Sequence, residues 1–184
     1  MPELLGTLHA QACNNAWANH RLYKACRALS REEYERKCES FFGSIRLTLE
    51  HILEVDRFYI DALTKGGRGR GVRTAGGLDS AELLGAAQGE SDRELLAFCR
   101  RLSLADLDKV VTLEREGYEQ YDSALRVLQH LFQHQIHHRG QVHGLLSLTS
   151  VAPPQLDEFF LADDLDNRAE FLEAFGLTEA DIWR

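Results

Sequence analysis

Four long stretches of this sequence carry apolar side chains at steps of three and four residues, the spacing that makes one face of an α-helix apolar. They predict helices over residues 3–29, 43–63, 80–102 and 123–148. Pro153 and Pro154 follow the fourth stretch and end it, because proline cannot donate a main-chain hydrogen bond. Only residues 110–113 form a convincing extended segment, continued irregularly to Tyr121, which is too short to build a sheet of its own. The sequence therefore favours an all-α fold, an antiparallel four-helix bundle with a short extended segment before its fourth helix.

Local signals refine the helix boundaries. Ser30 begins a Ser-Arg-Glu-Glu capping box, which predicts a short separate helix after the first long one. Gly85 and Gly89 weaken the third helix, and a second capping box at Ser91 predicts that the helix restarts there. Residues 65–77, KGGRGRGVRTAGG, are too rich in glycine for a helix and predict a flexible, solvated connection. Contact with an anionic substrate or a partner is the alternative for its basic side chains.

Composition places the chain among ordinary globular proteins. Its 184 residues suffice for one domain, and 44% hydrophobic with 27% charged residues is typical of a packed core under a charged surface. With 21 Lys and Arg against 29 Asp and Glu, the net charge of −8 argues against a nucleic-acid partner, which needs clustered cations. No apolar run is long enough to span a bilayer and no leader pattern begins the sequence, so we expect a cytoplasmic protein without a membrane partner.

Histidine is the residue whose placement points most directly to chemistry. The chain has eight histidines, and four of them fall within nine positions: His130, His134, His137 and His138. Residues four apart on a helix are separated by about 6 Å of rise and lie on nearly the same face, so His134 and His138 can bind one ion together. His130 and His138 are separated by about 12 Å of rise, too far to share that ion. A third ligand must come from another helix.

Three histidines outside this helix are candidates for the third ligand. His9 and His20 are expected to face solvent, whereas His51 lies in the apolar stripe of the second helix. His51, His134 and His138 would form a three-nitrogen site with open coordination positions, which is the catalytic type of metal site. The alternative is that these histidines are satisfied core residues that bind no ion.

The three nitrogen donors restrict the kinds of metal that can bind but do not identify one. Three imidazoles suit one divalent transition metal, and affinity does not separate zinc, nickel, cobalt, copper and iron. The sequence has no H-E-x-x-H, G-x-S-x-G, P-loop or haem-attachment motif, nor the Glu-x-x-His pairs of a ferritin-like di-iron site. These absences favour the three-histidine site. His130 is interpreted as lining a pocket or packing inside, and His143 is expected at the periphery. His137 lies about 60° around the helix from His134, in the opposite sense from His138, and is set aside as a surface or supporting residue.

Other candidate residues have less specific interpretations. Glu54, one turn beyond His51, either orients a ligand or is a solvated carboxylate. Asp56 lies about 140° around the helix from His51, so it is expected to cap or pair with another helix. Arg139 is expected to tie the fourth helix to a carboxylate. Four cysteines are too far apart for a C-x-x-C motif and are interpreted as reduced, buried thiols, with a reactive thiol as the alternative: Cys13, Cys26, Cys38 and Cys99.

Three motifs resemble those of one known family. His134–Gln141, HQIHHRGQ, resembles the H-x-x-H-H-R-G-Q signature of the DinB-like superfamily of metal-binding four-helix bundles. Asn15–Asn19, NAWAN, resembles its N-x-W-A-N motif, and Leu49–Asp56, LEHILEVD, resembles its L-x-H-x-x-x-x-D motif. This resemblance predicts a DinB-like domain over residues 1–161. The acidic residues 162–184 are then a helical extension that packs on the bundle or on a dimer partner.

The resemblance implies a divalent metal held by His51, His134 and His138, a bundle fold and a homodimer. Characterised relatives include thiol-dependent transferases and isomerases that use mycothiol or bacillithiol, and many members have no assigned reaction. We therefore expect a metal-dependent enzyme, a thiol-dependent transferase or small-molecule hydrolase, with a thiol or electrophile as substrate. The alternative is a non-catalytic, stress-related metal-binding protein whose ion stabilises the bundle.

Overall fold

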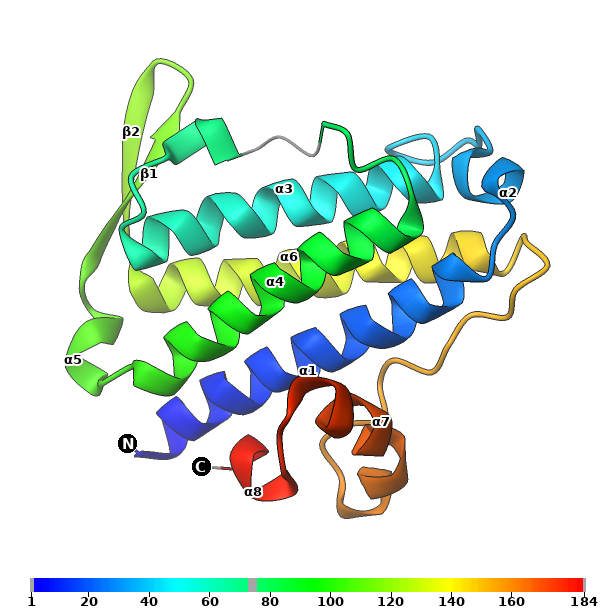
Figure 1. The fold of residues 1–184 in the computed structure, drawn as a ribbon. Helices are drawn as coiled ribbons and strands as arrows, with labels where there is room; N and C mark the ends of the chain where they lie inside the picture. The colour runs from blue at the N-terminus through cyan, green and yellow to red at the C-terminus, as the bar shows by residue number, and fades with distance from the viewer. Residues whose placement is uncertain (1, 73–75, 184) are drawn as a thin grey trace.

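The computed structural model describes residues 2–72 and 76–183 (Figure 1). The fold is mostly helical, and four long helices lie side by side: α1 (Pro2–Arg27), α3 (Ile45–Thr64), α4 (Ala81–Arg101) and α6 (Ala124–Leu146). Both α1 and α3 pack against α4 and α6. Helices α1 and α6 run in one direction and α3 and α4 in the other, so α1 is antiparallel to α4 and α3 to α6. Every end of these helices lies within two residues of its predicted position.

Serine side chains begin most of the helices. The hydroxyl oxygens of Ser44, Ser80 and Ser123 accept hydrogen bonds from the main-chain N–H groups three residues later, which satisfies donors that have no partner within the helix. Ser30 does the same for the short helix α2 (Arg31–Glu35), and the Glu33 side chain completes the capping box. The separate helix predicted after α1 is confirmed.

Helix α4 is continuous, so the predicted restart at Ser91 is wrong. Ser91 is buried in the middle of α4, and the helix is capped at Ser80 instead. Packing overrides the weak helix preference of glycine, because buried residues such as Leu84 and Leu95 hold both halves of α4 against the core. Gly85 also has a packing role, since a Cβ there would lie 3.0 Å from Cδ1 of Tyr23. Glycine at this position lets α4 approach α1 closely.

An antiparallel hairpin follows the short helix α5 (Leu104–Leu107) and leads into α6. Strand β1 (Val110–Arg115) pairs with β2 (Tyr118–Ser123) along its whole length. The irregular continuation predicted after residue 113 is therefore wrong. Gly117 has a φ of +79°, which lets the chain reverse tightly, and Val111 and Leu113 are buried on the face of β1 that covers the bundle. The tight turn and the packing of β1 on the bundle let residues 118–123 pair with β1 as a regular strand, although they are mostly polar.

The connection between α3 and α4 is partly ordered around one carboxylate. Asp61 of α3 accepts hydrogen bonds from the main-chain N–H groups of Arg68 and Gly69 and pairs with the Arg68 guanidinium at 2.8 Å. A turn of 3-10 helix, η1 (Gly69–Val72), follows. These residues are tied to α3, in contrast to the flexible connection that their composition predicts. Residues 73–75 of that connection lie outside the described residues.

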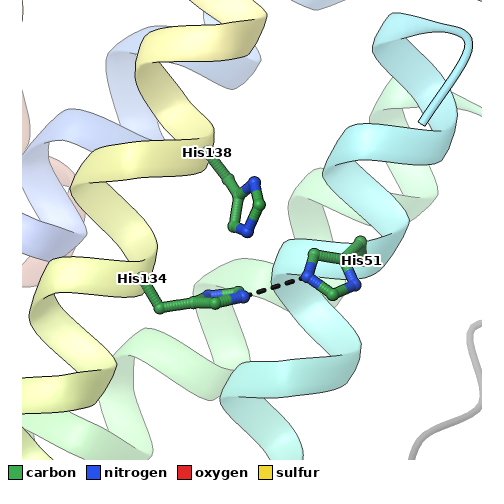
Figure 2. A group of neighbouring side chains, drawn as sticks. All are labelled: His51, His134 and His138. Atoms are coloured by element: carbon green, nitrogen blue, oxygen red, sulfur yellow. Dashed lines mark hydrogen bonds between the residues drawn. The ribbon is translucent and has the colours of Figure 1, made fainter. Parts of the chain in front are cut away.

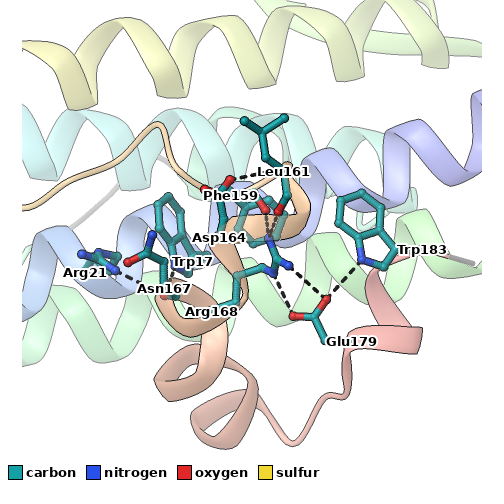
Figure 3. Close-up of polar contacts among 9 residues, drawn as sticks. All are labelled: Trp17, Arg21, Phe159, Leu161, Asp164, Asn167, Arg168, Glu179 and Trp183. Atoms are coloured by element: carbon teal, nitrogen blue, oxygen red, sulfur yellow. Dashed lines mark hydrogen bonds and ion pairs between the residues drawn. The ribbon is translucent and has the colours of Figure 1, made fainter.

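The C-terminal segment folds back onto α1 (Figure 3). It contains a short 3-10 turn and two helices: η2 (Ala162–Asp164), α7 (Leu165–Phe175) and α8 (Glu179–Ile182). The indole N–H of Trp17 donates to the main-chain oxygen of Asn167 at 2.8 Å. Arg168 is 2% exposed and pairs with Glu179 at 2.8 Å, which joins α7 to α8. The predicted contact with the bundle is thus made within the chain, and the division between residues 1–161 and 162–184 stays a prediction.

Apolar side chains fill the space between the helices and under the C-terminal segment. The largest fully buried side chain is Trp17, whose ring centroid lies 5.3 Å from that of Phe159. This contact joins the centre of α1 to the chain that leads into α7. None of the described helices combines the length and the apolarity needed to cross a lipid bilayer.

Candidate metal centre

Three imidazole rings meet between α3 and α6 (Figure 2). His51 comes from α3, and His134 and His138 come from successive turns of α6, which packs against α3. One ring nitrogen of each histidine lies within 4.8 Å of the other two. The Nε2 atoms of His51 and His134 are 3.0 Å apart, about the separation of two ligands at right angles around an ion with bonds of about 2.1 Å. The structure thus brings together the three residues that the sequence singles out.

A hydrogen bond determines which nitrogen of His138 faces the other rings. The side-chain oxygen of Gln141 can only accept, and it lies 2.8 Å from Nδ1 of His138, so Nδ1 carries the proton. The other ring nitrogen keeps its lone pair and points toward His51 and His134 in Figure 2. The Gln141 amide also lies 3.2 Å from Nε2 of His137. His138 is therefore oriented from outside the cluster, as ligating histidines usually are.

Burial keeps two of the imidazoles neutral. It lowers the pKa of His134 to about 3, with smaller contributions from the neighbouring histidines. It also lowers the pKa of His138, although the hydrogen bond to Gln141 acts in the opposite direction. Both rings therefore offer a lone pair at neutral pH, which is the form that binds metals. Nδ1 of His134 is buried without a hydrogen-bond partner among the described residues, so this ring is poorly satisfied by the protein alone.

The three rings open onto a cavity of about 350 Å³. Its walls are largely aromatic: the Phe42 ring stacks on His51 with centroids 4.2 Å apart, and Tyr59 lines the cavity as well. His130 lines the cavity as well, with its ring 5.1 Å from that of Tyr59, which selects the first of its two predicted roles. Open space beside the ligand atoms is the feature that separates catalytic metal sites from closed structural ones.

Comparison with known protein families assigns the chain to one of them. The family model described as the DinB family matches residues 7–168, most of the sequence. The chain belongs to the DinB family. The matched region contains the three histidines and ends within α7 of this DinB protein. Among curated proteins, no match to the sequence is found.

A second polar cluster of the DinB protein lies on the inner side of α6, and all four long helices contribute to it. Its members are Asn15 and Asn19 from α1, Asp56 from α3, Gln88 and Asp92 from α4, and Gln135 and Arg139 from α6. One guanidinium nitrogen of Arg139 donates to the side-chain oxygens of Asn15, Asn19 and Gln135 at 2.6, 3.1 and 2.9 Å. The predicted direct link from Arg139 to a carboxylate is therefore replaced by bonds to amides. We call these seven side chains the polar layer.

Two buried carboxyls complete the polar layer. Asp56 accepts hydrogen bonds from Gln88 at 2.7 Å and from Gln135, which confirms its predicted pairing with other helices. Asp92 accepts from Asn19, Gln88 and Asn15 at 2.9, 3.2 and 3.3 Å. Burial raises the pKa of Asp92 to about 6 and raises that of Asp56 well above its ordinary value. Burial lowers the pKa of Arg139 only to about 10, so the guanidinium remains charged at neutral pH.

The remaining candidates of the DinB protein lie apart from the three rings. His9 was expected to face solvent, which is wrong: it is 7% exposed, with Nε2 2.7 Å from the main-chain oxygen of Asp181. The His9 side chain is buried by α8, which is far from it in the sequence. His20 is half-buried beside Glu170 at 3.4 Å, and His143 is half-buried beside Pro154. His137 is exposed, which agrees with its interpretation as a surface or supporting residue.

The other predicted reactive groups do not join the cluster. Glu54 is half-exposed and is not among the residues that line the cavity. All four cysteines are free, and burial raises the pKa of Cys13, Cys26 and Cys99 to about 12. Such thiols are poor nucleophiles at neutral pH, which supports the interpretation of them as buried, reduced side chains.

Sequence reasoning missed two contributors to the centre. Gln141 lies one turn after His138, and its position in the same helix is a signal that could have identified it as the partner of Nδ1. Phe42 precedes α3, and no spacing rule places its ring against His51. The residues present fit a metal ion, because three nitrogen donors converge beside open space and one of them, His134, has an unpartnered buried nitrogen.

Proposed function

We propose that this DinB protein binds one divalent transition-metal ion through His51, His134 and His138. The convergence of one nitrogen from each ring on a single point beside an open cavity is the observation that carries the proposal. Zinc, nickel, cobalt, copper and iron all suit a set of three imidazoles. The four long helices, two of which carry the rings, make up the antiparallel four-helix bundle of our proposal, antiparallel in the pairs α1–α4 and α3–α6.

The proposed activity is that of a metal-dependent enzyme, a thiol-dependent transferase or a small-molecule hydrolase. When bound, such an ion lowers the pKa of a water or thiol and so provides a nucleophile near neutral pH. The chain contributes orientation and exclusion of water: Gln141 holds His138, and Phe42 covers His51. The substrate is a small thiol or electrophile, a size that a cavity of about 350 Å³ accommodates.

A non-catalytic metal-binding role, related to stress, is the second candidate. It is favoured by the fact that the three rings come from two different helices, so a bound ion would join α3 to α6. Turnover separates the two candidates: the enzyme converts at least one member of a panel of thiol acceptors and hydrolysable esters and amides, and the non-catalytic protein converts none while still losing stability on metal removal.

Elemental analysis of protein purified without a histidine tag tests the metal site. We expect about one equivalent of metal in the wild type and little in His134→Ala. His143→Ala is the matched control, because His143 lies on the same helix but contacts Pro154 instead of the cluster. Absence of metal from the wild type, or equal metal in wild type and His134→Ala, would contradict the site.

The proposal also includes a homodimer and a cytoplasmic location, with no nucleic-acid partner. The net charge of −8 supports the last of these, since phosphate binding needs clustered cations. Light scattering coupled to size exclusion measures the mass of the particle, and a mass of one chain of 20.9 kDa would contradict the dimer.

A further inference from the structure

The cavity beside the three histidines is also lined by a charged group. Arg115, the last residue of β1, lines the cavity together with Phe41, Phe42, Phe58 and Tyr59. Its guanidinium carbon lies 5.5 Å from the centre of the Phe58 ring and 5.8 Å from that of Tyr59. The same small space therefore joins imidazoles, aromatic rings and a single guanidinium.

Two hydrogen bonds hold the Arg115 side chain in place and leave other guanidinium N–H groups available. Nε donates to the side-chain oxygen of Gln120 on β2 at 3.0 Å, and Nη2 donates to the Tyr59 hydroxyl at 3.2 Å. A guanidinium has five N–H donors, so these bonds leave donors for a ligand. The hairpin and α3 thus position the group from two sides, which reduces the entropy that a ligand must remove on binding.

The charge of Arg115 is not neutralised by a carboxylate. In the described part of the chain, Arg115 forms no ion pair, and no Asp or Glu is among the residues that line the cavity. The neighbouring Glu114 is turned away, since its carboxylate accepts the main-chain N–H of Arg70. Among the described residues, the cavity is thus lined by one guanidinium and no carboxylate, in a chain with 29 acidic residues and a net charge of −8.

We infer that the cavity binds a small organic carboxylate, with its carboxylate on Arg115 and its apolar body between the aromatic rings. A planar guanidinium matches a carboxylate with two parallel hydrogen bonds. The rings of Phe42 and Tyr59 supply apolar contact, and the part of the ligand farthest from Arg115 reaches the three histidines. This inference rests on the proposed function, because it names the class of ligand that the same centre would act on.

Binding of phenylacetate and of its neutral analogue phenylacetamide tests the inference. Titrations followed by calorimetry or by protein NMR are run on the metal-free and on the metal-loaded protein. We expect the carboxylate to bind at least tenfold more tightly than the amide in the metal-free form, where only Arg115 distinguishes them. Equal affinities for the two compounds would overturn the inference. Inorganic phosphate is a third probe, and phosphate binding more tightly than phenylacetate would overturn the assignment of an apolar body.

Substitution of Arg115 locates the effect. Arg115→Gln should abolish the preference for the carboxylate, and Arg115→Lys, which keeps the charge but not the planar donors, should retain part of it. Arg126→Gln is the matched control, because the Arg126 side chain is 78% exposed, pairs with Asp122 and lies outside the cavity. A preference that persists in Arg115→Gln would overturn the inference. The wild-type comparison of carboxylate with amide decides the matter alone where a variant fails to fold.

Metal analysis of every sample keeps two failures apart. Full metal content with equal binding of carboxylate and amide contradicts the carboxylate inference and leaves the metal site intact. Absence of metal from the wild type contradicts the proposed function, while a carboxylate preference in that same protein still supports the role of Arg115.

Discussion

On one side of α6, His134 and His138 face an open cavity; on the other side, Gln135 and Arg139 face the interior of the protein. The residues alternate in the sequence, and both pairs meet side chains from α3. Arg139 reaches three side-chain oxygens and its neighbours are bonded to one another across four helices. The His134 ring has one nitrogen without a partner, and its other nitrogen lies 3.0 Å from a second imidazole.

The comparison shows how two polar clusters on the same helix differ in the number of their groups that have partners. The polar layer closes on itself: the donors of Arg139 and the carboxyls of Asp56 and Asp92 find partners within it. Two oxygens of the layer lack a partner among the described residues, but the raised pKa of Asp56 favours a proton that turns an acceptor into a donor. The histidine cluster has at least two neutral imidazoles, lone pairs that accept no hydrogen bond from the polar layer, and adjacent space. The histidine cluster has room for a ligand and an unpartnered nitrogen of His134, whereas most polar groups of the layer are bonded to one another.

Removal of Arg139 should have the largest effect on stability, because it breaks the hydrogen bonds of the polar layer, the closed side of α6. Arg139→Met keeps much of the volume but leaves the Asn15 and Asn19 oxygens and the Asp92 carboxylate buried beside no cation. We expect the free energy of unfolding, measured by urea denaturation of metal-free protein, to fall by about 3–5 kcal/mol. Arg126→Met, at a side chain that is 78% exposed, should change it by less than about 0.5 kcal/mol. Equal effects of the two substitutions would show that the layer is not the structural element that we describe.

Metal removal should have the next largest effect on stability, and it acts on the histidine cluster, the open side of α6. An ion that binds only the folded protein raises its free energy of unfolding by about 2.7 kcal/mol when the free ion is at 100 times its dissociation constant. Chelation should therefore lower the melting temperature of wild-type protein and leave that of His134→Ala unchanged. Identical melting curves of the wild type with and without metal would contradict an ion at this centre.

A further pH dependence, separate from that of the buried histidines, should arise from Asp92 in the polar layer. The pKa of Asp92 is raised by burial to about 6, above the ordinary value of about 3.9 in an unfolded chain. The folded protein then binds more protons than the unfolded one, so Asp92 stabilises it most below about pH 4, and this contribution is lost as pH rises through about 6. The charged groups that act on this carboxyl are Asp56, Arg139 and Arg93.

The variant Asp92→Asn isolates this term, because it keeps the acceptor oxygen and removes the titration. We expect the stability of metal-free wild type, relative to Asp92→Asn, to fall by of order 2 kcal/mol between pH 4 and pH 7. Urea denaturation across this range measures it. Parallel curves for the two proteins would mean that the pKa of Asp92 is not raised in the folded state. The histidines titrate in both proteins and cancel in the difference.

The sequence predicted the parts of the site that depend on one helix. The i, i+4 spacing placed His134 and His138 on one face of α6, and the apolar stripe placed His51 inside the bundle, because the helical period alone determines both. The helix boundaries followed from the same period and from serine caps. The rotation of α6 that separates His134 from Arg139 was likewise predictable in outline.

Contacts between distant segments were not predictable in this way. His9 looked exposed on α1 because its cover, α8, lies 172 residues away. Ser91 has the sequence of a cap, but packing of α4 against α1 and α3 keeps the helix continuous through it. The position of Arg115 depends on the register of the hairpin and on Tyr59 of α3. Pairwise packing of separate elements decides all of these, and a period within one element carries no information about it.

The smallest effect should come from Gln141, which supports the open side without touching the other two rings. Gln141→Ala removes the acceptor that fixes the proton on Nδ1 of His138, so we expect metal affinity to fall about tenfold, the lower end of such effects. Competition with a chelator of known affinity measures the dissociation constant. His137→Ala is the control, because His137 contacts the far end of the same amide and should change the affinity less. If Gln141→Ala retains wild-type affinity, the orientation of His138 is set by its burial against α3 and Phe42 instead, and the open side would then share the self-sufficiency of the closed one.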